Sequence, residues 1–143
     1  NDGRIIARKV TTYQDSGAYL RFSSYASMKH CGHMPGPYSI PNVWVDSVVV
    51  FTNRTPSNAM RGFGVMAGSF ALEVQMDKIA ETIGMDPWEL RLINAYREGD
   101  MKSHLKPVED AGMVETILSA AKLAGKELPA NFQNMSSLDR KAG

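Results

Sequence analysis

The sequence contains a single cysteine, Cys31, among its 143 residues. One cysteine excludes an internal disulfide, and it cannot by itself supply the set of thiolates that holds an iron–sulfur cluster. Such sparing use of cysteine is typical of proteins in a reducing compartment. We therefore expect a cytoplasmic protein.

Long apolar runs and a strong charge of one sign are also missing. No stretch approaches the roughly 20 apolar residues that span a bilayer, and no signal-peptide pattern opens the chain. The 16 basic and 15 acidic side chains give a formal net charge of +1. No strong field therefore attracts nucleic acid or anionic lipid, and we expect neither as a partner.

The common nucleotide and nucleophile motifs are absent as well. The sequence has no P-loop, no Rossmann fingerprint, no paired CxxC and no nucleophile elbow. Its 43% of hydrophobic residues can bury one core of ordinary size. The sequence starts at Asn1 in mid-pattern without an initiator Met, and we interpret it as a piece of a larger protein.

The patterns that are present begin with two strands. The Ile, Val and Thr content of residues 4–13 predicts a strand, and Asp15-Ser16-Gly17 predicts a turn after it. The β-branched run over residues 43–52 favours a buried strand. Between the strands we expect a short helix within residues 19–34, ended by Pro35-Gly36-Pro37.

Three helices are predicted next, over residues 66–83, 86–99 and 112–123. The second has a strong start, because Asp86 can cap it, Pro87 suits its first turn and Glu89 follows as in a capping box. Gly84 and Gly125 fit the C-terminal caps of the first and last helices. The expected class is α+β, with strands followed by three helices.

The predicted organisation is one domain over residues 1–125 and a polar, unpatterned tail or linker over residues 126–143. Two strands alone are marginally stable and usually pair with further strands. This supports the interpretation of the chain as a fragment.

The run from Thr52 to Gly64 is the most informative part of the sequence. It ends in Arg61-Gly62-Phe63-Gly64, directly before a long helical pattern. Glycines let a backbone approach a ligand closely with free amide groups, and Phe63 offers a flat face for stacking. A plain strand-to-helix turn is the alternative. A nucleic-acid-binding repeat is excluded, because the pattern occurs once between apolar, patterned segments.

A second cluster suggests metal chemistry. His30, Cys31 and His33 lie within four residues and could contribute to a small zinc module. No further cysteine is available and His104 is far away in the sequence, so we interpret the cluster as polar histidines beside a half-buried thiol. We assign neither metal ligands nor catalytic residues in this chain.

Three further blocks, taken together with the run from Thr52 to Gly64, carry a family resemblance. They are Leu72–Ala80, Gly84–Arg91 and Asn94–Asp100. In order and spacing, with no insertion, the four blocks resemble the molybdenum-binding subunit of the xanthine dehydrogenase and aldehyde oxidoreductase family. The resemblance includes the upstream strands and covers about the first 125 residues.

The resemblance implies part of the catalytic subunit of a molybdenum hydroxylase, which oxidises an N-heterocycle or an aldehyde with water as the oxygen source. It implies a molybdenum–molybdopterin cofactor, expected as the cytosine dinucleotide, bound by the whole subunit. The expected partners are the remainder of that subunit, and iron–sulfur and flavin subunits or domains with 2Fe–2S clusters and FAD. The family's catalytic Glu lies outside this chain, so we expect the chain alone to be inactive.

Within the family pattern, Arg61 and Gly62 match the loop beside the molybdenum centre, and Phe63 matches the aromatic residue that stacks on the substrate. The family usually continues with Pro-Gln where Met66-Ala67 stand here. The hydrogen-bonding side chain of that Gln is therefore missing, and the identity of the substrate stays undetermined. A natural split subunit, as in nicotinate dehydrogenase, and a fragment of an uninterrupted subunit both fit. The alternative function is a non-catalytic interaction domain derived from this family.

Overall fold

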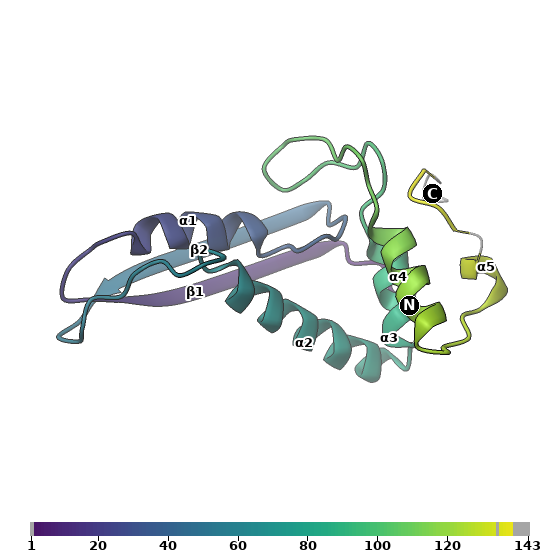
Figure 1. The fold of residues 1–143 in the computed structure, drawn as a ribbon, viewed down its shortest axis with the longest axis horizontal. Coiled ribbons are helices and arrows are strands. Elements are labelled where there is room, and N and C mark those ends of the chain that lie inside the picture. Colours follow the sequence, from purple (N-terminus) through teal and green to yellow (C-terminus); the bar gives the residue numbers. More distant parts are fainter. Residues whose placement is uncertain (1, 134, 139–143) are drawn as a thin grey trace. The chain divides into compact units, whose positions relative to one another are not determined.

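A computed structural model of the chain describes residues 2–133 and 135–138. Helices and strands are mixed, which confirms the predicted α+β class (Figure 1). In chain order the elements are β1 (Ala7–Gly17), α1 (Ser23–His33), β2 (Asn42–Phe51), α2 (Val65–Ile83), α3 (Pro87–Asn94), α4 (Met113–Leu123) and α5 (Ala130–Gln133).

The chain divides into two compact units. The strand unit consists of Ala7–Gly36 and Asn42–Val74, and so contains β1, α1, β2 and the first half of α2. The helical unit takes the residues before β1, the segment Pro37–Pro41 and the chain from Gln75 onward. The predicted helix before the proline pair is α1, which ends at His33.

The two strands are parallel neighbours, with Ala7 beside Asn42 at one end and Gly17 beside Phe51 at the other. The predicted turn over residues 15–17 is wrong, because the strand continues through it with an irregular register between Asp15 and Gly17. The Asp15 carboxylate accepts a hydrogen bond from the Gly17 amide at 2.8 Å, so the turn-forming residues make a bulge.

The residues before β1 do not extend the strand, although residues 4–13 were predicted as one. Their backbone groups form hydrogen bonds with the buried Asn94 side chain instead. Its Oδ1 accepts from the Ile5 amide at 2.8 Å, and its Nδ2 donates to the Gly3 carbonyl at 2.8 Å. A buried amide satisfies its own polar groups in this way, and it fixes the N-terminal segment to the end of α3.

One face of the two-stranded sheet is covered by α1, which lies along β2 (Figure 1). The other face carries Tyr13, Trp44 and Val48, whose side chains are 75%, 63% and 42% exposed. β2 was predicted to be buried. Within this chain it is covered on one face, because the helix that crosses between the strands packs on one side of the sheet.

Local capping residues set the helix ends largely as predicted. Asp86 Oδ1 accepts hydrogen bonds from the Trp88 amide at 2.8 Å and the Glu89 amide at 3.4 Å, which starts α3. Gly84 closes α2 in the left-handed region, with φ +69°, and the Met85 amide donates back into the last turn.

The predicted extension of α3 to residue 99 is wrong, because the helix ends at Asn94. Ala95 leaves it to form a bridge with Tyr38. The buried Arg97 guanidinium then donates to the Leu92 carbonyl at 3.0 Å and the Ala95 carbonyl at 2.9 Å. These bonds satisfy carbonyls that a continued helix would have used.

The core of the helical unit lies between α3, α4 and the segment after α4. It is built from Leu92, Ala95, Val114, Ile117, Ala121, Leu128 and Phe132. Two of these core residues, Leu128 and Phe132, belong to the segment predicted as a tail, and each is 7% exposed. The polar composition hid this short anchored stretch. The domain boundary at residue 125 stays a prediction.

No helix in the described part of the chain is both long enough and apolar enough to cross a membrane.

Candidate functional site

The segment that leads from β2 to the candidate loop is fixed to the end of β1. The Thr52 amide donates to the Gly17 carbonyl at 3.1 Å, and the Ser57 amide donates to the Ser16 carbonyl at 2.9 Å. A side chain on Gly17 would lie 2.4 Å from the Thr55 carbonyl oxygen, so only glycine allows this approach. The route of the chain from β2 towards the loop is therefore set by backbone contacts.

Asp15 strengthens the same junction. The hydroxyl of Thr52 donates to Asp15 Oδ1 at 2.7 Å, and Arg54 Nη1 lies 3.6 Å from Oδ2. The hydrogen bond from the Thr52 hydroxyl, and to a smaller extent the one from the Gly17 amide, holds the pKa of the Asp15 carboxyl below its ordinary value. The ionised carboxylate thus ties the strand end to the segment after β2.

The Arg61–Gly64 loop has an unusual backbone. Gly62, Phe63 and Gly64 follow one another in the left-handed region, with φ values of +94°, +48° and +82°. The loop is closed by hydrogen bonds from the Phe63 amide to the Met60 carbonyl, at 2.8 Å, and from the Val65 amide to the Gly62 carbonyl, at 3.0 Å. A non-glycine residue at positive φ is strained, and such strain clusters at functional sites.

Several amide groups of this loop are open. Among the residues that the structure describes, the amides of Arg61, Gly62 and Gly64 donate no hydrogen bond. They lie directly before α2, where the helix dipole adds partial positive charge. Open amides beside a helix start are suited to a negatively charged or oxygen-rich group.

The side chains around the loop are exposed. Phe63 is 42% exposed and Met60 is 71% exposed, and Arg61 is exposed as well. Met66 is 56% exposed, and a side chain added to Gly62 would lie 3.3 Å from its Cγ. The structure therefore brings Arg61, Gly62 and Phe63 together on one exposed turn. Their binding roles stay predictions.

His30 lies beneath the loop, a position that the sequence patterns did not reveal. Its Nδ1 lies 2.9 Å from the Gly64 carbonyl oxygen, and the residue is 9% exposed. The one available signal was a spacing: Gly64 and Gly68 are four residues apart, as are Ala26 and His30. Glycines at positions 64 and 68 leave room for a neighbouring side chain, but they do not identify the hydrogen bond.

The cluster of His30, Cys31 and His33 does not converge. His30 turns to Gly64, whereas His33 Nδ1 lies 2.7 Å from the Lys29 carbonyl of its own helix. Cys31 is a free, half-buried thiol. Within residues 2–133 and 135–138, no group of three or more His, Cys, Asp or Glu side chains is arranged to hold a metal ion.

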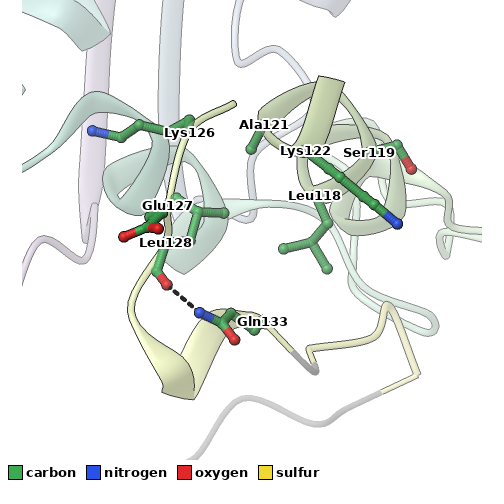
Figure 2. Close-up of a pocket in the computed structure, with 8 residues that line it drawn as sticks. All are labelled: Leu118, Ser119, Ala121, Lys122, Lys126, Glu127, Leu128 and Gln133. Carbon is green, nitrogen blue, oxygen red and sulfur yellow. Dashed lines mark hydrogen bonds between the residues drawn. The ribbon is translucent and has the colours of Figure 1, made fainter. Parts of the chain in front are cut away.

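A separate cavity of about 440 Å³ lies in the helical unit, between α4 and the segment that follows it (Figure 2). Its lining residues are Leu118, Ser119, Ala121, Lys122, Lys126, Glu127, Leu128 and Gln133. Lys126 is paired with Asp86 at 2.6 Å, and Gln133 donates to the Leu128 carbonyl at 2.7 Å. None of the predicted site residues lines it.

Comparisons with known proteins cover most of the chain. The sequence model of the molybdopterin cofactor-binding domain matches residues 1–95. The nicotinate dehydrogenase large molybdopterin subunit of Eubacterium barkeri is 38% identical over 124 residues. The aldehyde oxidoreductase of Megalodesulfovibrio gigas is 38% identical over 99 residues. These matches cover 86% and 69% of this chain, but only 29% and 11% of the two relatives.

Solved structures give the same result. The aldehyde oxidoreductase of Desulfovibrio desulfuricans superposes with a TM-score of 0.80 at 32% identity, over 86% of this chain and 14% of that one. Quinoline 2-oxidoreductase of Pseudomonas putida superposes with a TM-score of 0.77 at 29% identity, over 87% of this chain and 16% of that one. The chain thus spans less than a third of each relative. It belongs to the molybdopterin cofactor-binding domain family, as part of a xanthine dehydrogenase-type molybdenum subunit.

Proposed function

We propose that the chain is part of a molybdenum hydroxylase that oxidises an N-heterocycle or an aldehyde, and that its Arg61–Gly64 loop forms one wall of the active site. The observation that carries this proposal is the loop itself, with three consecutive residues at positive φ and open amides at Arg61, Gly62 and Gly64. The relatives named above include a nicotinate dehydrogenase subunit and aldehyde oxidoreductases, which gives the two substrate classes.

The loop fits the cofactor by its donor chemistry. Open amides at the start of α2 suit the oxygen atoms of a molybdenum–molybdopterin. When bound, the cofactor supplies the two-electron oxidation of the substrate with oxygen from water. The amides of Arg61 and Gly62 orient the cofactor, and they carry no proton transfer of their own.

Phe63 supplies the substrate wall. Its half-exposed ring sits on a backbone held in a rarely occupied region, so the ring direction is set by the loop. An aromatic face of this kind binds a flat heterocycle by offset stacking. It excludes water from one side of the substrate and holds the reacting carbon in position, which is a catalytic contribution through orientation.

The rest of the site comes from outside this chain. The sheet face opposite α1 exposes the large apolar side chains of Tyr13, Trp44 and Val48, and exposed apolar groups of this kind often mark an interface. We assign it to the remainder of the molybdenum subunit, and the isolated chain is inactive because it holds one wall alone. Cytosine dinucleotide as the pterin form, 2Fe–2S clusters and FAD in partner subunits or domains, and a cytoplasmic location complete the proposal.

The test uses the assembled enzyme with Phe63→Ala and the matched control Phe70→Ala, which removes an exposed ring, 73% accessible, from α2. Loss of stacking and apolar contact raises KM for a flat heterocyclic substrate by about tenfold in Phe63→Ala. The molybdenum content stays at the parent level, and the control keeps the parent KM. Equal KM values in both variants would refute the role of Phe63. Purified enzyme without molybdenum would refute the proposed function.

A further inference from the structure

We propose that His30 is a positioning residue that holds the Arg61–Gly64 loop in its binding conformation. The hydrogen bond between His30 Nδ1 and the Gly64 carbonyl, at 2.9 Å, carries this proposal. The functional consequence rests on the proposed function of the loop, whereas the structural consequence can be measured without it.

The hydrogen bond identifies which nitrogen of the imidazole donates. A carbonyl oxygen can only accept, so Nδ1 must carry the hydrogen and donate it to Gly64. The neutral ring then has its hydrogen on Nδ1 rather than on Nε2. His30 is 9% exposed, so the bond is made in a mostly buried setting, and it is the shorter of two hydrogen bonds to this carbonyl, the other coming from the Gly68 amide at 3.4 Å.

The packing around this bond leaves little room for movement. A side chain on Gly64 would lie 3.1 Å from the Ala26 carbonyl oxygen and 3.3 Å from His30 Cβ. A side chain on Gly68 would lie 3.2 Å from His30 Nδ1 and 3.1 Å from Met34 Sδ. The two glycines, one turn apart, therefore form a groove that receives the His30 ring.

The helix that carries His30 is itself fixed to the sheet by polar contacts. The Ser27 and Ser47 hydroxyls lie 2.8 Å apart, and the Thr12 hydroxyl donates to Ser47 at 3.1 Å. The buried residues of α1 are Ser23, Ser27 and His30, all of them polar. Hydroxyl contacts thus link β1, β2 and α1, and His30 extends this network to the loop.

The position of the bonded carbonyl explains why the loop depends on it. Gly64 is the last of the three residues at positive φ and follows Phe63 directly. The Gly64 carbonyl shares its peptide unit with the Val65 amide, which donates to the Gly62 carbonyl at 3.0 Å and closes the loop. A neighbouring donor that holds this carbonyl therefore also holds the peptide unit that closes the loop behind Phe63.

The experiment compares His30→Leu with His30→Asn in the assembled enzyme. Leucine removes the donor and keeps an apolar side chain of moderate size. Asparagine can place its amide nitrogen near the position of Nδ1 and so restore the hydrogen bond. His33→Asn is the matched control, because His33 is exposed on the same helix and lies against the Lys29 carbonyl of its own helix.

The structural readout is amide hydrogen exchange of the peptides that contain residues 61–67, measured by mass spectrometry. We expect faster exchange in His30→Leu, with His30→Asn and His33→Asn close to the parent. The functional readout is kcat/KM, which falls by about tenfold in His30→Leu and is rescued in His30→Asn. If His30→Leu does not assemble, His30→Gln, whose amide lies one bond further out, takes its place.

The two readouts separate the possible failures. Unchanged exchange in His30→Leu, or no rescue of exchange by His30→Asn, would overturn the positioning role. Faster exchange in His30→Leu, rescued in His30→Asn, supports it even where Phe63→Ala leaves KM unchanged, a result that refutes the proposed function instead. Slower turnover with parent-like exchange would overturn the proposal, because the loop would not have moved.

Discussion

Gly64→Ala tests the loop most sharply. At φ +82° a residue with a Cβ pays about 1–2 kcal/mol relative to glycine. The added Cβ would also lie 3.1 Å from the Ala26 carbonyl oxygen and 3.3 Å from His30 Cβ, so the loop or α1 must shift by a few tenths of an ångström. We expect a stability loss of about 2 kcal/mol and a fall in kcat/KM of between about tenfold and a hundredfold.

Two other glycines separate the backbone cost of a positive φ from the steric contact with α1. Gly84 has φ +69° with nothing within 4 Å of an added Cβ, so Gly84→Ala carries the backbone cost alone and leaves kcat/KM unchanged. Gly68 lies inside α2, where an added Cβ would crowd Met34 and His30, so Gly68→Ala introduces the steric contact without the cost of a positive φ. Gly32→Ala, in α1 with open space, is its control and gains at most about 1 kcal/mol from helix propensity.

The assays are thermal unfolding of the assembled enzyme and steady-state kinetics with one substrate. The reasoning predicts that Gly64→Ala and Gly68→Ala lower kcat/KM, whereas Gly84→Ala and Gly32→Ala do not. A loss of activity in Gly84→Ala equal to that in Gly64→Ala would refute it, because general destabilisation would then explain both.

Further predictions concern the helical unit, each read by thermal or acid unfolding. Asp86→Ala removes the N-cap of α3 and costs about 1 kcal/mol, whereas Asp86→Asn keeps most of it; equal losses would contradict the capping role. Arg97→Met leaves two buried carbonyls unsatisfied and costs about 2 kcal/mol, and an unchanged melting temperature would contradict the assignment. Phe132→Ala costs about 3 kcal/mol of stability, and an unchanged melting temperature would contradict the place of Phe132 in the core. Hydrogen bonds from Ser137 lower the pKa of Glu115 in the folded protein. The stability that they add is fully present above the ordinary pKa of the carboxyl, about 4.3, and is lost as the pH falls through the lower pKa of the folded state. Glu115→Gln should therefore make the stability less dependent on pH in this acid range.

Local signals predicted most of the fold. The cap at Asp86, the proline behind it and the glycines at positions 84 and 125 act within one helical turn, so the sequence places those helix ends correctly. The errors arose where a distant partner decided the outcome. The backbone of Gly3 and Ile5 bonds to Asn94 rather than extending β1, and no local pattern indicates that contact.

The candidate site divides in the same way. Glycines on both sides of Phe63 indicated an exposed loop with open amides, and the backbone angles agree with that prediction. The contact of His30 with Gly64 could not be predicted, because 34 residues separate them and a lone histidine has many uses. The polar buried face of α1 hid its packing as well, since helix prediction relies on an apolar stripe.

The central claim is that this chain forms one wall of a molybdenum cofactor site in a larger assembly. Native mass spectrometry of the protein purified from its own source, combined with metal analysis, tests it most directly. The account predicts a complex heavier than this chain that contains molybdenum and a pterin dinucleotide. A species that contains this sequence, carries neither molybdenum nor pterin and binds no larger subunit would contradict it.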